Sequence, residues 1–136
     1  RPSGPAWRRR SSSASAIQNA RSVYAYNSIL SAPAGKQVCS SWLTGGSFNL
    51  GSDASCGPSA QTLDPLLGPL QNNRGAWTHA LAIYSPAIDA ADPANCIAED
   101  QRKVARPIDG NGDGVAACDI GAFEGLVWVF LPAVQK

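Results

Sequence analysis

The most regular pattern along the chain is an alternation of apolar and polar positions over residues 23–30, VYAYNSIL. A period of two is typical of a half-buried β-strand. It places Val23, Ala25, Asn27 and Ile29 on one face, and Tyr24, Tyr26, Ser28 and Leu30 on the other. Because a buried amide without partners is costly, we expect Asn27 to be hydrogen-bonded, and in stacked strands equivalent side chains above or below it are candidate partners.

Turn-forming residues divide the rest of the chain into short pieces. Residues 31–37, the glycine pair inside 41–50 and the cluster 51–59 all interrupt extended stretches. Residues 64–73, DPLLGPLQNN, carry two prolines and predict an apolar loop packed on a core. A strand is expected from residue 78, broken at Ser85-Pro86, and a last extended segment over 120–134.

Many short strands separated by Gly, Pro and Asn turns predict an all-β domain. The pattern leaves a sandwich, a barrel and a solenoid open, and no internal repeat of fixed period is visible. The 136 residues suffice for one domain, and the low charged content of 15% disfavours long surface helices. We therefore expect one β domain.

Basic residues are concentrated at the beginning of the chain. Four of the eleven Lys and Arg residues lie in the first ten positions, which leaves seven basic against ten acidic groups elsewhere. We expect residues 1–20 to be a disordered leader or linker, and residues 21–136 to be the folded domain. The mildly acidic body argues against nucleic acid binding. The apolar stretch 126–134 is too short for a membrane span.

Four cysteines are spaced widely along the chain, at Cys39, Cys56, Cys96 and Cys118. With one histidine and no Cys-x-x-Cys, zinc ligation is disfavoured. Of the three possible disulfide pairings, the local one is the simplest, and each bond would close a loop of about 20 residues, worth roughly 3 kcal/mol. Disulfides would place the protein outside a reducing cytosol, whereas four buried thiols remain the alternative.

Five blocks of the sequence, in this order, carry a resemblance to a known family. The blocks are YNSIL, FNLGSDASCG, TLDPLLGPLQNN, THALAIYSPAIDAAD and DQRKVARPIDGNGDGVAACDIGAFE, and they span about residues 21–124. Together they resemble the C-terminal region of large bacterial secreted proteins with right-handed parallel β-helix repeats, the choice-of-anchor Q domain proteins. The resemblance implies the closing part of a β-solenoid, with the proline-rich loop and two disulfide-closed loops as a cap over the last coil.

The stretch DGNGDGVAACD at 109–119 is a candidate calcium loop. Asp109, Asn111, Asp113 and Gly114 match the first half of an EF-hand loop, but the position that needs a bidentate carboxylate is Ile120. Calcium held by Asp109, Asn111, Asp113 and Asp119 in another geometry is one reading. The other is an Asp/Asn/Gly turn that binds its own backbone.

Catalytic and ligand-binding residues are harder to assign. His79, the single histidine, is expected to be a structural residue within a strand. A glycosidase-like pair could be drawn from Asp89, Asp92, Asp100 and Glu124, although Asp89 fits a turn acceptor better. We expect Arg102, Lys103 and Arg106 to be solvated surface charges, and pairing with neighbouring acids or contact with an acidic sugar are the alternatives. Exposed Trp42, Trp77 or Trp128 would be able to stack on sugar rings.

The leading functional expectation is a non-catalytic capping and surface-presentation module of a secreted bacterial β-helix protein. Its partners would be upstream β-helix coils and extracellular ligands such as surface glycans. One alternative is a fragment of a β-helix polysaccharide lyase or hydrolase. Another is a calcium-stabilised binding domain. An enzyme would need a groove lined by acids and a basic residue. A calcium-stabilised domain would have a melting temperature that changes when chelator is added.

Overall fold

The computed structural model describes residues 15–18 and 21–126, and within them the regular elements are short strands and two 3-10 turns. The elements are β1 (Tyr24–Tyr26), β2 (Ile29–Leu30), β3 (Gly45–Ser47), β4 (Leu50–Gly51), η1 (Ala54–Ser59), β5 (Gln61–Thr62), β6 (Leu67–Asn73), β7 (Ala76–Leu81) and η2 (Pro93–Asn95). No α-helix occurs in these residues, so they contain no helix that could cross a membrane. The predicted all-β class is confirmed.

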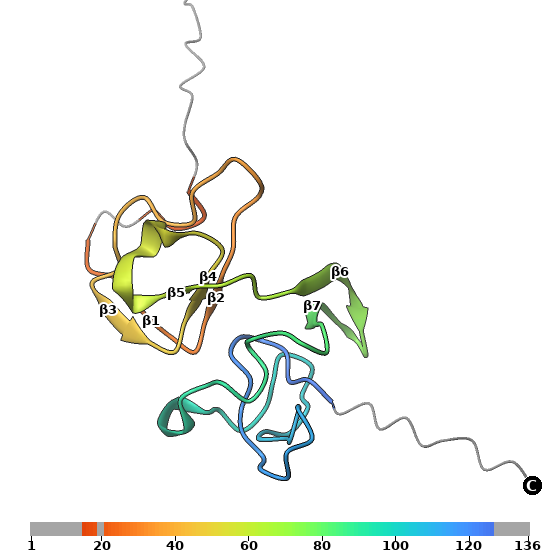
Figure 1. Ribbon diagram of the computed structural model, residues 1–136. Helices are drawn as coiled ribbons and strands as arrows, with labels where there is room; N and C mark the ends of the chain where they lie inside the picture. The colour runs from red at the N-terminus through yellow and green to blue at the C-terminus, as the bar shows by residue number, and fades with distance from the viewer. Residues whose placement is uncertain (1–14, 19–20, 127–136) are drawn as a thin grey trace, which may run out of the picture.

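The first four strands pair in parallel with one constant register. Tyr24 of β1 lies opposite Gly45 of β3, and Leu30 of β2 lies opposite Gly51 of β4, so the offset is 21 residues in both pairs. β5 continues the second sheet beyond β4. A repeat was not visible in the sequence because register partners such as Tyr24 and Gly45 are chemically unlike. We call residues 15–18 and 21–63 the stacked strands (Figure 1).

Close strand pairing depends on glycine at one position. A side chain at Gly46, which has φ of +125°, would place its Cβ 1.7 Å from the carbonyl oxygen of Ala25 on the paired strand. Any other residue would therefore push β3 away from β1. The stack also begins earlier than expected, because the amide of Ile17 donates to the carbonyl of Val38 at 2.8 Å. The first paired residues thus lie upstream of the boundary predicted near Arg21.

The single strand predicted over residues 23–30 is wrong, because the chain turns a corner at Asn27. Asn27 has φ of 48°, and Phe48, its register partner in the next layer, has φ of 54°. The left-handed conformation ends β1 and redirects the following residues into β2. Ala25 packs with the first hydrophobic core, whereas Ile29 packs with the second. Leu30, the other residue of β2, packs with the first core. The alternation in the sequence therefore belongs to two strands, of which the second contacts both cores.

The proline-rich stretch 64–73 is not the predicted loop but contains β6, the first strand of an antiparallel hairpin with β7. One extra residue on β6 between Leu67 and Leu70 forms a bulge, which contains Pro69. A two-stranded hairpin tolerates proline at such a position because the ladder is already interrupted there. Arg74 and Gly75 both have positive φ, as the favoured two-residue hairpin turn requires.

Residues 82–126, here named the C-terminal segment, contain no strand, only η2 and isolated bridges. The extended segment predicted over 120–134 is therefore absent from 120–126, and its remainder lies outside the described residues. Figure 1 shows the hairpin and this segment lying beside the stacked strands. Its backbone groups are bonded partly by isolated backbone pairs, such as the amide of Ala91 to the carbonyl of Cys118 and the amide of Ile120 to the carbonyl of Ala87. Turns and the side chains described below supply further partners.

Each of two hydrophobic cores contains one disulfide. Cys39 and Cys56 are bonded inside the core of the stacked strands, where both are buried. Cys96 and Cys118 are bonded in the second core, with Cα atoms 6.0 Å apart. The described residues contain no free cysteine, and the local pairing predicted from the sequence is confirmed.

The second core joins the C-terminal segment to the stacked strands. Leu50 of β4, 2% exposed, and Ile29 of β2 lie on the same face, because they are register partners. Ala87, Ala91, Cys118 and Ile120 of the C-terminal segment pack against that face. The segment thus covers a side of the β2–β4–β5 sheet. The exposed residues of β5, at the last edge of the sheet, are not part of this core.

Candidate functional site

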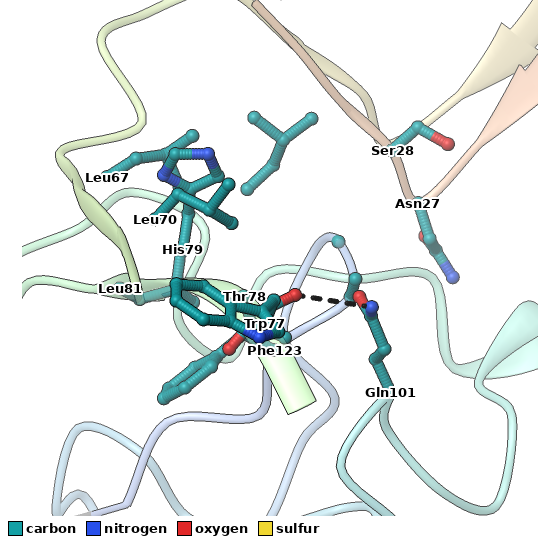
Figure 2. Close-up of a pocket in the computed structure, with 13 residues that line it drawn as sticks. Asn27, Ser28, Leu67, Leu70, Trp77, Thr78, His79, Leu81, Gln101 and Phe123 are labelled. Carbon is teal, nitrogen blue, oxygen red and sulfur yellow. Dashed lines mark hydrogen bonds between the residues drawn. The ribbon is translucent and has the colours of Figure 1, made fainter. Parts of the chain in front are cut away.

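A cleft of about 460 Å³ opens between the hairpin, the corner of the stacked strands and the C-terminal segment (Figure 2). We call it the hairpin cleft. Its lining residues are Asn27, Ser28, Ile29, Leu67, Leu70, Trp77, Thr78, His79, Leu81, Gln101, Gly121, Ala122 and Phe123. The volume falls within the range of small-ligand sites. The cleft is therefore a candidate site for a small ligand.

Aromatic and aliphatic side chains form much of the cleft surface. Trp77 is 65% exposed and Leu70 is 56% exposed, both on the hairpin. Phe123 lies on the opposite side, and the guanidinium of Arg102 sits 3.6 Å from the centre of its ring. That cation–π contact fixes the ring from behind. Large apolar groups left open to solvent on facing elements are typical of a binding surface.

Two polar residues of the cleft are fully occupied by the fold. The Asn27 side-chain amide donates to the carbonyls of Asp92 and Asn95, and its oxygen accepts from the amide of Asp92. The hydroxyl of Thr78, a residue that is 3% exposed, accepts from Asn73. Asn27 is hydrogen-bonded as predicted, but its partners belong to the C-terminal segment and not to an equivalent asparagine in the stack.

Other polar residues of the cleft keep acceptor atoms available. His79 Nδ1 lies 2.8 Å from the carbonyl oxygen of Gly68, and since a carbonyl only accepts, Nδ1 must carry the proton. Nε2 of the neutral ring is then an acceptor. Gln101 Nε2 donates to the carbonyl of Trp77 at 3.4 Å, and Gln101 Oε1 stays available as an acceptor. The Ser28 hydroxyl donates to the carbonyl of Tyr26, and its oxygen lone pairs stay available.

The position of His79 differs from the expectation. It was predicted to be a structural residue on the aliphatic face of its strand, but it is exposed, whereas Thr78 on the other face is buried. No hydrogen bond joins His79 to a Ser, Thr, Asp or Glu side chain within the described residues. The cleft lining contains no Asp, Glu, Lys or Arg. This chemistry suits the binding of a neutral molecule better than acid–base or nucleophilic catalysis.

The acids considered for catalysis form a buried network in the C-terminal segment. Asp100, 4% exposed, accepts from the amides of Arg102, Val104 and Glu124, and also forms an ion pair with the Arg102 guanidinium at 2.7 Å. Arg102 also donates to the carbonyl of Glu124 at 2.5 Å. One carboxylate thereby joins two stretches of backbone, around residues 102–104 and at residue 124.

A second part of the network continues from Glu124. Its carboxylate, 0% exposed, accepts from the amides of Ile108 and Asp119, and lies 3.1 Å from Arg106 Nε. Asp119, also 0% exposed, accepts in turn from the amides of Asp89 and Gly125. We call Asp100, Arg102, Arg106, Asp119 and Glu124 the carboxylate–arginine network. Its acids bind backbone groups and are closed off from any substrate.

Two further acids from the candidate glycosidase pair also serve the backbone. Asp89 accepts from the amides of Gly110 and Asn111, and Asp92 caps η2 by accepting from the amide of Ala94. Neither lines the hairpin cleft. The structure therefore does not bring the four candidate acids together around a shared groove among the described residues.

Burial raises the pKa of each of these acids, and hydrogen bonds decide whether the net shift is up or down. Desolvation raises the pKa of Asp119 and of Glu124, and the nearby Arg106 only partly offsets it. For Asp100, desolvation is outweighed by the amides of Glu124 and Val104 and by Arg102, so its pKa is lowered. Hydrogen bonds from Ser55 lower the pKa of Asp53 in the same way. The network thus contains carboxylates that differ in how well their charge is compensated.

The expectation of solvated basic residues is wrong for two of the three. The side chains of Arg102 and Arg106 are each 4% exposed and belong to the carboxylate–arginine network. Lys103 alone is solvated, with a side chain 83% exposed and a loose pair to Glu99 at 3.6 Å. Sequence reasoning missed the network because its partners lie up to 24 residues apart and no short motif connects them.

The candidate calcium ligands do not converge on one point. In the acidic loop, residues 109–114, Asp109 accepts from the amides of Gly112 and Gly114, and the Asn111 oxygen accepts from the amide of Asp113. Asp119 is instead turned into the network. Within the described residues no group of three or more acidic, His or Cys side chains is placed to hold a metal. Calcium binding remains an untested prediction.

Among the tryptophans proposed to stack on sugars, Trp77 lines the hairpin cleft and Trp42 is 69% exposed on another part of the stacked strands. Trp128 lies outside the described residues. The cleft residues Leu70, Gln101 and Phe123 were not singled out from the sequence. The apolar residues of β6 are the sequence signal for this surface, but the sequence pattern predicts a loop over residues 64–73.

Comparison of the chain with protein-family models, with curated proteins and with solved structures gave no match.

Proposed function

We propose that this chain is a non-catalytic capping and surface-presentation module of a secreted or cell-surface parallel β-helix protein. The observation that carries the proposal is the parallel pairing of β1 with β3 and of β2 with β4, both at an offset of 21 residues. β5 adds a third parallel strand to the second sheet at a shorter offset of 11 residues, from Leu50 to Gln61. A constant offset between parallel strands is what successive coils of a solenoid produce. The resemblance to secreted β-helix proteins noted above points in the same direction.

The edge of the stack formed by β1 and β2 fits a junction with further coils. In the described part of the chain, each of these strands has a strand neighbour on one side alone. The amide of Thr44 donates to the carbonyl of Val23, and the amide of Asn27 donates to the carbonyl of Ser47. The backbone groups of the odd-numbered residues in and beside β1 therefore point toward β3. The amides of Tyr24 and Tyr26 then point to the opposite edge, where upstream coils would pair.

The C-terminal segment supplies the capping part of the proposal. It covers the face of Ile29 and Leu50 and is cross-linked by its own disulfide. An irregular, disulfide-closed cover has few unpaired strand edges to recruit other chains. Two disulfides also support an oxidising compartment, as expected of a secreted protein. The alternative of a lyase or hydrolase fragment is less well supported, because its candidate acids bind backbone amides.

Insertion of one extra coil tests the solenoid part of the proposal. A copy of residues 23–43, which spans one 21-residue offset, is inserted before Val23 with the copied cysteine changed to alanine. Ala25 of the original coil is changed to glycine, because it then takes the position that Gly46 holds against Ala25. The added coil should pair with β1, because its strands meet β1 in the same register as β1 meets β3. Hydrogen exchange should then show the amides of Tyr24 and Tyr26 becoming at least about tenfold more protected.

The matched control is an insert of the same length and composition in shuffled order. It should leave the exchange of Tyr24 and Tyr26 unchanged or faster and should not raise the melting temperature. Equal behaviour of the two inserts would show that the offset is not an extensible repeat, and the solenoid assignment would be withdrawn.

A further inference from the structure

We propose that the hairpin cleft binds a neutral sugar unit of an extracellular polysaccharide, with one face of the sugar ring stacked on Trp77. The inference rests on the proposed function for its extracellular setting, and otherwise on the cleft itself. It places ligand contact within this chain, at the junction of the hairpin and the C-terminal segment (Figure 2).

The apolar part of the cleft fits the C–H face of a pyranose ring. Trp77 is 65% exposed on the hairpin, so its indole is open to a ligand without any rearrangement of the core. Leu70 extends the same surface, and Phe123 bounds it from the C-terminal segment (Figure 2). An aromatic ring combines a large apolar face with low conformational freedom, which favours stacking of a flat, weakly apolar surface.

The polar part of the cleft fits the hydroxyl groups of the same ring. His79 Nε2, Gln101 Oε1 and the lone pairs of Ser28 Oγ are acceptors, and in the described residues their known bonds use other atoms. Three acceptors without a charged group call for a ligand that brings several neutral donors. Sugar hydroxyls do so, and they can also accept from the Gln101 amide.

The lack of charged residues in the cleft lining favours the binding of a neutral sugar over an acidic one. The lining contains no Lys or Arg, and Arg102, the nearest cation to Phe123, is held by Asp100 with its side chain 4% exposed. A uronic acid or sulfated sugar would therefore bring a carboxylate or sulfate into a site without an ion-pair partner. Removing such a charge from water without compensation is costly. Neutral hexose or pentose units are thus favoured.

The test follows the four tryptophan indole N–H signals by NMR in the full chain while neutral oligosaccharides are added. The probes are cellohexaose, xylohexaose and maltohexaose, with hexagalacturonate as the acidic comparison. The Trp77 signal, assigned from its loss in Trp77→Ala, should shift with at least one neutral probe. Trp77→Ala should weaken binding by about tenfold or more, as removal of a central aromatic contact does.

Trp42→Ala is the matched control, since Trp42 is similarly exposed but does not line the cleft. It should retain the affinity of the unmodified chain. Melting curves establish that both variants are folded, and because Trp77 is exposed, its removal should leave the fold intact. His79→Ala and Gln101→Ala provide independent variants of the polar side of the cleft, each with a smaller loss.

The inference is overturned if no neutral probe shifts the Trp77 signal, if Trp77→Ala binds as well as the unmodified chain, or if hexagalacturonate binds as tightly as the neutral probes. A failure of this kind leaves the coil-insertion result untouched, because that experiment reads the β1 edge and not the cleft. Conversely, if sugar binds at the cleft but the inserted coil does not pair with β1, the glycan site is kept and the solenoid assignment is withdrawn.

Discussion

Replacing Asn27 by glycine should loosen the C-terminal segment while leaving the stacked strands folded. The Asn27 side chain makes three hydrogen bonds across the junction, two to carbonyls of Asp92 and Asn95 and one from the amide of Asp92. Glycine accepts the φ of 48° without strain, so Asn27→Gly removes the bonds alone. The variant therefore isolates the contribution of one side chain to the attachment of the segment.

The magnitude follows from the number and exposure of these bonds. At about 0.5–1.5 kcal/mol for each, and with the junction only partly buried, the loss should be roughly 2–3 kcal/mol. Asn27→Ala should cost about 1 kcal/mol more than Asn27→Gly, because a residue with a Cβ is strained at positive φ. The difference between the two variants thus measures the backbone term separately.

The rate of disulfide reduction is a suitable assay, because each core contains one disulfide. Loosening the C-terminal segment should expose Cys96–Cys118 more often while Cys39–Cys56 stays protected. Since about 1.4 kcal/mol corresponds to a factor of ten, Asn27→Gly should speed reduction of Cys96–Cys118 roughly 30- to 150-fold. Mass spectrometry after limited exposure to thiol and alkylation distinguishes the two bonds.

Asn49 provides the matched control for this experiment. It also makes three hydrogen bonds, but all are within the stacked strands, to Ala25, Ser59 and Ser28. Asn49→Gly should destabilise the first core and favour reduction of the other disulfide. The reasoning would be refuted if Asn27→Gly and Asn49→Gly accelerated the same bond, or if Asn27→Gly left both rates unchanged.

Four other predictions concern the cross-links, the buried charges and the acidic loop. Changing Cys39 and Cys56 together to serine should lower the free energy of unfolding by about 3 kcal/mol in urea titrations, given a separation of 17 residues. Arg106→Met should cost roughly 3–5 kcal/mol at neutral pH, since it leaves the buried carboxylates of Asp119 and Glu124 uncompensated, and a loss below about 1 kcal/mol would contradict this role. The folded-state pKa values of Asp119 and Glu124 are raised, so the stability that these groups contribute is complete below their ordinary values of 3.8 and 4.5 and is lost as pH rises through the raised values. The urea midpoint of unfolding should therefore fall from mildly acidic to neutral pH. The fall should be smaller in Asp119→Asn. Melting temperatures should be the same in chelator and in calcium, because the oxygens of the acidic loop bind its own amides, whereas a clear rise with calcium would restore the metal site.

Local features of the fold could be predicted from the sequence because they depend on neighbouring residues. Turn residues and prolines mark the breaks between short strands, and they gave the all-β class. The cysteine spacing gave the local pairing, because a short loop costs less entropy to close than a long one. These inferences needed no knowledge of which strands lie side by side.

Features that depend on distant partners were not predictable in the same way. The corner at Asn27 interrupts a pattern that alternates on both sides of it, so one strand was expected where two exist. The hairpin at 67–81 was missed because Pro69 argues against a strand unless a bulge accommodates it, and a bulge depends on the partner strand. The hairpin cleft was missed with it, since Trp77 meets Gln101 and Phe123 only in the folded chain.

The carboxylate–arginine network explains how a segment without strands can hold one wall of the cleft in place. Backbone amides in an irregular region need acceptors, and here buried carboxylates provide them where a sheet would use carbonyls. The Asp100 carboxylate and the Glu124 backbone carbonyl both accept from Arg102, whose guanidinium packs on the Phe123 ring. The buried charges of the carboxylate–arginine network therefore position a residue that lines the cleft. Loss of Arg102 should accordingly alter sugar binding at the cleft as well as stability.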